Sequence, residues 1–252
     1  MNLWEAAFLG TLQGLTEFLP VSSSGHLCLA QHLLGVDVSL AISFDVALHL
    51  ASLLAILAVF RGQLRTVIMQ DRKVLIYVAL SALPAAAVVL FWRDDLKWLF
   101  FQPWAVGLAL MVTGGFLVAG DFQDEERLEL KQTGFLNSLL VGLAQSLAIV
   151  PGISRSGSTI VSGLACGMKR SAALEFSFLM AIPAILGAAC VELPQLAQSA
   201  EIPVASVAVG MTLSFVFSVA GLLLLKKVLA SKKLKWFGFY CFLAGAGALF
   251  LF

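Results

Sequence analysis

The sequence predicts an all-α integral membrane protein with six transmembrane helices, two re-entrant helical hairpins and an inverted-topology repeat. Three observations lead to this fold class: the composition, the lengths of the apolar stretches, and two interrupted stretches that resemble each other. Of the 252 residues, 60% are hydrophobic and 12% are charged, and the mean hydropathy is +0.96. A soluble domain of this size carries about twice that charge fraction. Most of the surface is therefore expected to face lipid, and no nucleic-acid partner is predicted.

Six apolar stretches are long enough to cross a bilayer, for which about 20 residues are needed. They are residues 41–60, 74–92, 101–119, 171–191, 203–225 and 236–252. Two further apolar regions, 3–34 and 134–167, are too long for one span and too short for two. Proline, glycine and serine interrupt them at 20–25 and 151–157. Non-helical backbone at membrane depth is tolerated only where it lines a cavity or is buried in protein. Each region is therefore expected to form a re-entrant hairpin beside an interior site.

The two interrupted regions share a pattern. The first reads GLTEFLPVSSSG from Gly14, and the second reads GLAQSLAIVPGISRSG from Gly142. Each is followed by a span that carries an acid next to a phenylalanine, Asp45 in the first case and Glu175 in the second. A hairpin returns to its starting side and three spans follow it, so the second half would be inverted. Interrupted helices at corresponding positions of inverted halves indicate a binding site near the midplane.

The repeat also divides the chain. We interpret residues 1–252 as a single membrane domain, with halves at approximately 1–120 and 132–252. A cytoplasmic linker is predicted at 121–131. The sequence leaves open whether the chain forms a homo-oligomer.

The basic residues predict the orientation. With the six spans placed as above, 13 lysines and arginines fall on one side and only Arg93 and Lys97 on the other. The 13 are Arg61, Arg65, Arg72, Lys73, Arg127, Lys131, Lys169, Arg170, Lys226, Lys227, Lys232, Lys233 and Lys235. Short loops rich in Lys and Arg stay in the cytoplasm. Both termini and the entrance of the first hairpin are then expected on the periplasmic side of a bacterial inner membrane.

The first interrupted region contains ionisable groups, which are costly inside a membrane and so point to function. Gln13 lies one helical turn before Glu17, and this pair of oxygen ligands suits a hard cation such as Mg²⁺ or Ca²⁺. A carboxylate that only caps nearby backbone is the alternative. His26 follows three serines and can act as an acid, a base or a nucleophile on phosphorus. His49 lies one turn after Asp45, where a structural hydrogen bond is as good an explanation as a catalytic role.

The serine tips predict an anion site. Ser22, Ser24 and Gly25 lie where a helix is expected to begin, and a helix N-terminus with serine and glycine binds anions. The second tip repeats this arrangement with Ser154 and Ser156. It adds Arg155, whose planar guanidinium matches phosphate. The alternative for Arg155 is a buried ion pair with Glu17, Asp45 or Glu175, and such a pair could open to receive a phosphate.

Together these groups favour phosphoryl chemistry, which needs an anion cradle, a metal position, an acid or base and an arginine. A transporter or flippase for a lipid phosphate would use the same inverted repeat and anion site. It would not need His26 close to the serines or a metal-binding Glu17, so we favour the phosphatase.

These motifs, FLPVSSSGH after Gln13 and Glu17 and PGISRSG around Arg155, resemble the bacterial undecaprenyl-diphosphate phosphatase family, the bacitracin-resistance phosphatases. The resemblance covers essentially the whole chain. It implies release of phosphate from undecaprenyl diphosphate, a lipid in the bilayer, which regenerates the lipid carrier for peptidoglycan synthesis. It also implies dependence on a divalent metal.

The resemblance also assigns residues. It places the acidic motif on Gln13 and Glu17 and the catalytic serine and histidine on Ser23 and His26, with Ser22 alongside. It places the arginine loop on Ser154, Arg155 and Ser156. The family's membrane acid falls on Asp45, where glutamate is usual, so Gln13, Glu17 and Asp45 are the expected metal ligands. With glutamine and aspartate at two of these positions, metal affinity is expected to be weaker or the ion to be held differently. Whether Ser23, His26 or a metal-activated water attacks phosphorus stays open.

Overall fold

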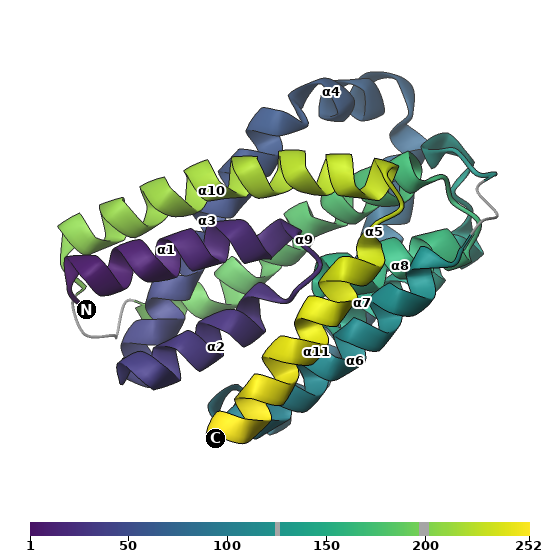
Figure 1. The fold of residues 1–252 in the computed structure, drawn as a ribbon. Helices are drawn as coiled ribbons and strands as arrows, with labels where there is room; N and C mark the ends of the chain where they lie inside the picture. Colours follow the sequence, from purple (N-terminus) through teal and green to yellow (C-terminus); the bar gives the residue numbers. More distant parts are fainter. Residues whose placement is uncertain (124–126, 197–201) are drawn as a thin grey trace.

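The computed structural model describes residues 1–252 except 124–126 and 197–201, so part of the predicted linker lies outside the described residues. The first half contains α1 (Leu3–Phe18), α2 (Ser23–Leu34), α3 (Val38–Val59), α4 (Arg61–Gln70), α5 (Arg72–Lys97), η1 (Trp98–Phe101) and α6 (Pro103–Asp121). The second half contains η2 (Leu130–Gln132), α7 (Phe135–Leu147), α8 (Arg155–Ala165), α9 (Arg170–Leu196), α10 (Val204–Ala230) and α11 (Leu234–Leu251). The described residues are almost entirely helical, as predicted (Figure 1).

Six helices among the described residues are long and apolar enough to cross a membrane: α3, α5, α6, α9, α10 and α11. Each coincides with one predicted span. α5 and α10 continue beyond the apolar stretches, because charged residues end a hydropathy run without ending a helix. α4 was not predicted; it carries Arg61 and Arg65 and is too polar and too short to register as a span.

Both predicted interruptions are real breaks between helices. α1 ends at Phe18 and α2 begins at Ser23, after Ser22 with φ of 68°. α7 ends at Leu147 and α8 begins at Arg155, after Gly152 with φ of 99°. Positive φ values end a right-handed helix, and the second one is taken by glycine, for which it carries no steric cost. The chain resumes each helix inside the predicted interruption.

Close helix pairs hold the bundle together. α1 lies along α10, α7 along α5 and α6 along α11 (Figure 1). Small residues line these seams: a Cβ added at Gly10 would lie 2.4 Å from the Gly210 carbonyl oxygen, and one at Gly114 would lie 2.8 Å from that of Gly238. Helices pack this closely in membranes where small residues allow backbone approach.

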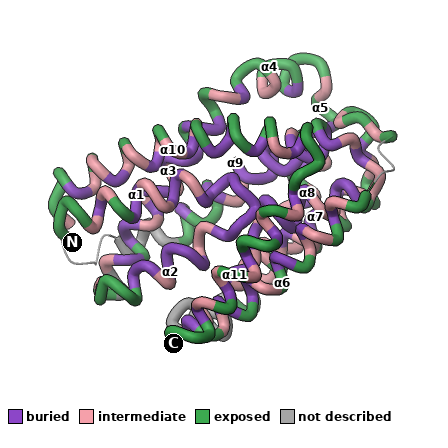
Figure 2. Tube along the Cα trace, in the orientation of Figure 1, coloured by how far each residue is buried: buried purple, intermediate pink, exposed green. Residues whose placement is uncertain are grey.

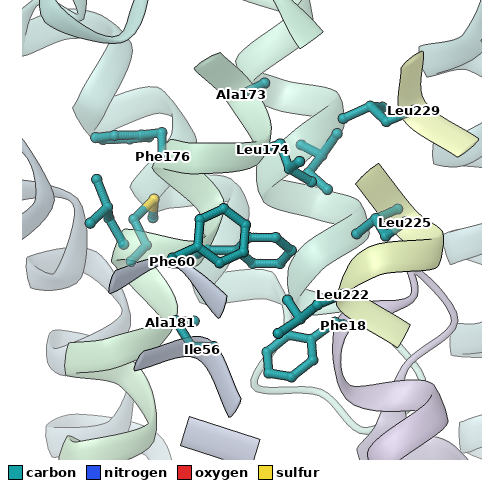
Figure 3. Close-up of a cluster of buried hydrophobic side chains, with 14 of the residues drawn as sticks. Phe18, Ile56, Phe60, Ala173, Leu174, Phe176, Ala181, Leu222, Leu225 and Leu229 are labelled. Atoms are coloured by element: carbon teal, nitrogen blue, oxygen red, sulfur yellow. The ribbon is translucent and has the colours of Figure 1, made fainter. Parts of the chain in front are cut away.

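A buried aromatic and aliphatic cluster anchors the end of α1 (Figure 3). The ring of Phe18 meets that of Phe178 edge to face with centroids 5.6 Å apart, and the ring centroid of Phe60 lies 4.8 Å from that of Phe178. Figure 2 shows buried residues along the centre of the bundle and exposed ones on its outward faces. Large apolar side chains such as Leu83 and Leu243 are more than half exposed there, as expected for surfaces facing lipid. Because Phe18 follows Glu17 directly, this cluster fixes the carboxylate next to it.

Candidate active site

The candidate site begins with two capped helices. The Ser22 hydroxyl accepts the N–H of Gly25 at 3.3 Å and starts α2. The Ser154 hydroxyl accepts the N–H of Gly157 at 3.1 Å and starts α8. Serine at this position satisfies a backbone donor that the first helical turn leaves free. The same residue type at the same offset therefore starts both helices.

The two tips touch. The Gly152 N–H donates to the Ser22 hydroxyl at 3.1 Å, and the Ser156 hydroxyl donates to the Leu19 carbonyl at 3.2 Å. A Cβ on Gly25 would lie 2.9 Å from the Gly152 Cα, so the backbones are in direct contact. Two helix N-termini thus meet at the centre of the molecule. Each carries a partial positive charge, which favours an anion between or beside them.

Glu17 is the centre of the site, although it is only 7% exposed. One carboxylate oxygen, Oε1, accepts Arg155 Nη2 at 2.8 Å. The other, Oε2, accepts the Ser23 hydroxyl at 2.6 Å and Gln13 Nε2 at 3.0 Å. His49 Nε2 lies 3.5 Å from Oε2, an ion pair when the imidazole is protonated. These donors compensate the carboxylate for its loss of water, as a buried charge requires.

Arg155 therefore pairs with Glu17 and, within the described residues, with neither of the other two acids considered. Its second contact is Nη1 to the Ser177 carbonyl at 3.5 Å, which is long for a hydrogen bond. The Ser177 hydroxyl lies 2.7 Å from that of Thr159, on the turn of α8 that follows Arg155. One edge of the guanidinium is thus held by a carboxylate and the other only weakly.

His26 has hydrogen-bond partners other than Glu17 and Ser23. Its Nδ1 is 2.8 Å from the Ser22 carbonyl oxygen, and its Nε2 is 2.7 Å from the Tyr240 hydroxyl on α11. The imidazole and the phenol are stacked with centroids 5.6 Å apart and planes 9° apart. In the structure the Ser23 hydroxyl is therefore hydrogen-bonded to the Glu17 carboxylate, and the His26 imidazole is hydrogen-bonded to Tyr240.

The predicted metal ligands are divided. Gln13 and Glu17 lie together, and the Gln13 Oε1 oxygen is buried without a hydrogen-bond partner. Asp45 is held instead by Gln31, whose Nε2 donates to Asp45 Oδ1 at 2.7 Å. The part of the chain that the structure describes has no group of three or more His, Cys, Asp or Glu side chains placed to hold a metal ion. The unpartnered Gln13 oxygen beside a carboxylate fits one hard cation that takes its other ligands elsewhere.

Three of the predicted phosphate-binding residues have structural partners. Ser22, Ser154 and Ser156 are at most 4% exposed, and their hydroxyls cap the helices or join the tips as described above. Ser24, by contrast, is half-buried, and its hydroxyl makes only a 3.4 Å contact with that of Ser22. An anion at this site would therefore meet backbone N–H groups, Ser23 and Ser24 more readily than the deeper serines.

Sequence reasoning missed three polar residues of the site. Tyr240 lies on the last helix and carries no local signal beyond being one of two tyrosines. Thr113 joins the second tip to α6, because its hydroxyl donates to the Gly152 carbonyl at 2.8 Å and accepts the Ser154 N–H at 3.0 Å. Ser177 follows Glu175 and Phe176, the acid and phenylalanine that begin the span after the second interrupted region. His49, for which two explanations were open, bonds the Asp45 carbonyl through Nδ1 at 2.7 Å and also reaches Glu17.

Comparisons with known proteins agree with these motifs. The family model described as "Bacitracin resistance protein BacA" matches residues 6–247. A protein of Halothermothrix orenii named undecaprenyl-diphosphatase is 37% identical over 250 residues, covering 97% of this chain and 96% of its own. Proteins of the same name from Carboxydothermus hydrogenoformans and Syntrophotalea carbinolica are 38% and 40% identical. The first covers 100% of this chain and 98% of its own, and the second covers 97% of each. With these matches over nearly its full length, the chain belongs to the bacitracin resistance protein BacA family.

Proposed function

We propose that this protein hydrolyses undecaprenyl diphosphate to undecaprenyl phosphate and phosphate, as the names of its relatives suggest. One observation in the structure carries the proposal: Arg155 and two helix N-termini converge on a single buried carboxylate that also accepts the hydroxyl of Ser23. The positive groups suit a diphosphate, and the Ser23–Glu17 pair suits attack on it. Release of the lipid monophosphate would return carrier for peptidoglycan synthesis and account for bacitracin resistance.

In the proposed binding step, the terminal phosphate binds beside Arg155, where Glu17 occupies only one of the two terminal guanidinium nitrogens. Arg155 has one Nη bonded to Glu17 and the other in a 3.5 Å contact, so it can grip a phosphate oxygen while keeping its counter-ion. The first-turn N–H groups of α2 and α8 face the same region and add partial positive charge. The polyprenyl tail extends from there along the exposed apolar faces of the helices.

In the proposed chemical step, the Ser23 oxygen attacks the terminal phosphorus and its proton passes to Glu17 Oε2, 2.6 Å away. The bond between that phosphorus and the bridging oxygen breaks, and undecaprenyl phosphate leaves. Water then attacks the phosphorus of the phosphoserine, and its proton passes to His26 Nε2. The bond between phosphorus and the Ser23 oxygen breaks, and that oxygen takes its proton back from Glu17. Phosphate leaves and carries away the proton of His26. A carboxylate activating a serine and an imidazole activating water are ordinary forms of base catalysis.

We propose that a divalent cation, Mg²⁺ or Ca²⁺, is held by Gln13 Oε1 and Glu17, whereas Asp45 is hydrogen-bonded to Gln31. Two protein oxygens leave most positions of a hard cation to water and to the diphosphate. Bound there, the ion would neutralise charge on the phosphoryl oxygens. Every proton transfer above is carried by Glu17, Ser23 and His26.

The function is tested with a polyprenyl diphosphate labelled with ³²P at its terminal phosphate and the purified protein in detergent. We expect release of labelled phosphate that falls when a chelator is added and returns with Mg²⁺ or Ca²⁺. Binding of the lipid without release would favour the transporter instead. Release that is insensitive to the chelator would contradict the cation proposal alone.

Quenching the same reaction in acid identifies the nucleophile. Attack by Ser23 leaves acid-stable label on the peptide that contains it, whereas attack by His26 gives a phosphoramidate that acid destroys. A directly attacking water leaves no label on the protein. We expect the stable ester at Ser23.

We further propose that α1–α2 and α7–α8 are re-entrant hairpins of two inverted halves. The pairing supports this: the first hairpin packs on α10 through α1, and the second packs on α5 through α7, so each half's hairpin lies against the second spanning helix of the other half. The basic residues gather where α4 and the α10–α11 connection lie, which supports a cytoplasmic location for that end and access to the site from the periplasmic side.

Cysteine labelling tests this orientation. In a background with the four native cysteines replaced, Val204→Cys and Met69→Cys would each be treated with an impermeant thiol reagent in intact cells. Both parent side chains are exposed, at 84% and 66%. We expect label at 204 in intact cells and at 69 only after the inner membrane is broken. The reverse pattern would invert the proposed orientation.

A further inference from the structure

The Tyr240 hydroxyl lies 2.7 Å from Nε2 of His26, the nitrogen that accepts a proton in the proposed chemical step. It joins residues 214 positions apart, from α2 in the first hairpin and α11 at the end of the chain. The neighbouring Cys241 also touches the first tip, because its thiol lies 3.9 Å from the Pro20 carbonyl oxygen. α11 therefore forms a wall of the site at two successive residues.

The chemistry of the partners fixes the roles of the two imidazole nitrogens. A backbone carbonyl can only accept, so the proton on the side of Ser22 must be on Nδ1. In the neutral imidazole, Nε2 then carries the lone pair and accepts the Tyr240 hydroxyl proton. The phenol ring lies parallel to the imidazole, so hydrogen bond and stacking act on the same ring.

Burial differs sharply between the two rings. His26 is 9% exposed, whereas Tyr240 is 45% exposed on the outer side of α11. The phenol thus spans from the surface of the bundle to the buried imidazole. A buried imidazole can rotate about its side-chain bonds unless both nitrogens are held, and here Ser22 holds one and Tyr240 the other.

We propose that Tyr240 is a positioning residue for His26: its hydroxyl fixes the imidazole in one orientation and tautomer, with Nε2 unprotonated, until the attacking water takes the place of the hydroxyl at Nε2. This rests on the proposed function, in which His26 Nε2 accepts the proton of the attacking water. Proton transfer requires the acceptor within hydrogen-bond distance in the right direction, and misplacement costs rate rather than substrate affinity. Tyr240 is expected to act on turnover and not on binding.

Tyr240→Phe is the decisive variant, because it keeps the ring and its stacking and removes only the hydroxyl. We expect kcat to fall about tenfold, the scale of a lost orientation, while KM stays within about twofold. The control is Tyr77→Phe, which removes the hydroxyl of the other tyrosine in the chain, part-buried on α5. That variant should keep wild-type kinetics.

The reactivity of His26 gives a readout that a loss of general stability would not reproduce. Diethyl pyrocarbonate reacts with an unprotonated imidazole nitrogen, and mass spectrometry reads the product at each of the three histidines. In folded Tyr240→Phe we expect His26 to react about fivefold faster, the effect of freeing one hydrogen-bonded lone pair, with His32 and His49 unchanged.

Wild-type kcat in Tyr240→Phe, or an unchanged rate of His26 modification, would overturn the positioning role. A failure of the proposed function looks different. In that case the wild-type protein releases no phosphate, while the modification rates still report whether Tyr240 holds His26.

Discussion

Glu17→Gln is expected to release phosphate about 10²–10⁴ times more slowly than the wild type, the range that a positioned base contributes. The carboxylate accepts from Arg155, Ser23 and Gln13 within 3.0 Å, so the amide would lose the charge that each donor meets. It would also present an NH₂ group to one of these donors. The measurement is kcat and KM for release of phosphate in the same detergent.

The matched control is Glu129→Gln, since Glu129 also pairs with a cation, Lys169 at 3.0 Å, but is exposed. We expect that variant to behave as wild type. Because a part-buried Arg155 without its carboxylate partner can destabilise the fold by up to about 3–5 kcal/mol, thermal unfolding of each variant is measured alongside. The double variant Glu17→Gln with Arg155→Gln restores charge balance and should regain stability without regaining activity. A folded Glu17→Gln protein that keeps a tenth of wild-type turnover would contradict the assignment.

Arg155→Lys is expected to lose about 2–4 kcal/mol of transition-state stabilisation, although it keeps the formal charge. One guanidinium nitrogen contacts Glu17 at 2.8 Å, and the other is available for the phosphate. A single ammonium group cannot hold both partners in this planar geometry. A buried lysine can also lose its proton, whereas arginine stays charged. Turnover and half-saturation are compared for wild type, Arg155→Lys and Arg155→Ala.

Arg61→Lys is the control, because Arg61 is an exposed arginine at the start of α4 and is not among the residues of the site. It should leave both constants unchanged. If Arg155→Lys is as active as wild type while Arg155→Ala is not, positive charge alone suffices. The proposal that one guanidinium nitrogen binds Glu17 and the other binds phosphate is then wrong. Equal activity in all three would make Arg155 a structural partner of Glu17.

Several features of this protein were predictable from local sequence. Six helices follow from apolar runs about as long as a bilayer requires, because a helix satisfies its backbone hydrogen bonds internally and apolar side chains can face lipid. The breaks before Ser23 and Arg155 follow from Pro20, Gly152 and the capping serines. Helix breaking and capping act within a few residues, so the local sequence is enough to predict where these breaks occur.

The sequence predicted which residues belong to the candidate site, but only part of how they contact one another. Glu17, Ser23, His26 and Arg155 were named because polar groups in apolar segments require a reason. Which acid Arg155 meets was left open among three, and the structure shows Glu17, 138 positions away. The sequence indicated His26 as close to the serines and left open which group attacks phosphorus. In the structure the Ser23 hydroxyl donates to Glu17, and His26 Nε2 pairs with the Tyr240 hydroxyl.

The sequence by itself determined that the chain is a helical membrane protein with two capped, interrupted segments, because hydropathy and capping are properties of neighbouring residues. Only the tertiary structure decided that the Ser22 hydroxyl would bond Gly152, that Asp45 would be held by Gln31, and that a tyrosine on the last helix would reach His26. The position of α11, which carries that tyrosine, depends on how closely small residues such as Gly114 and Gly238 let it approach α6. That distance is set by packing between elements far apart in the chain, on which no local pattern reports.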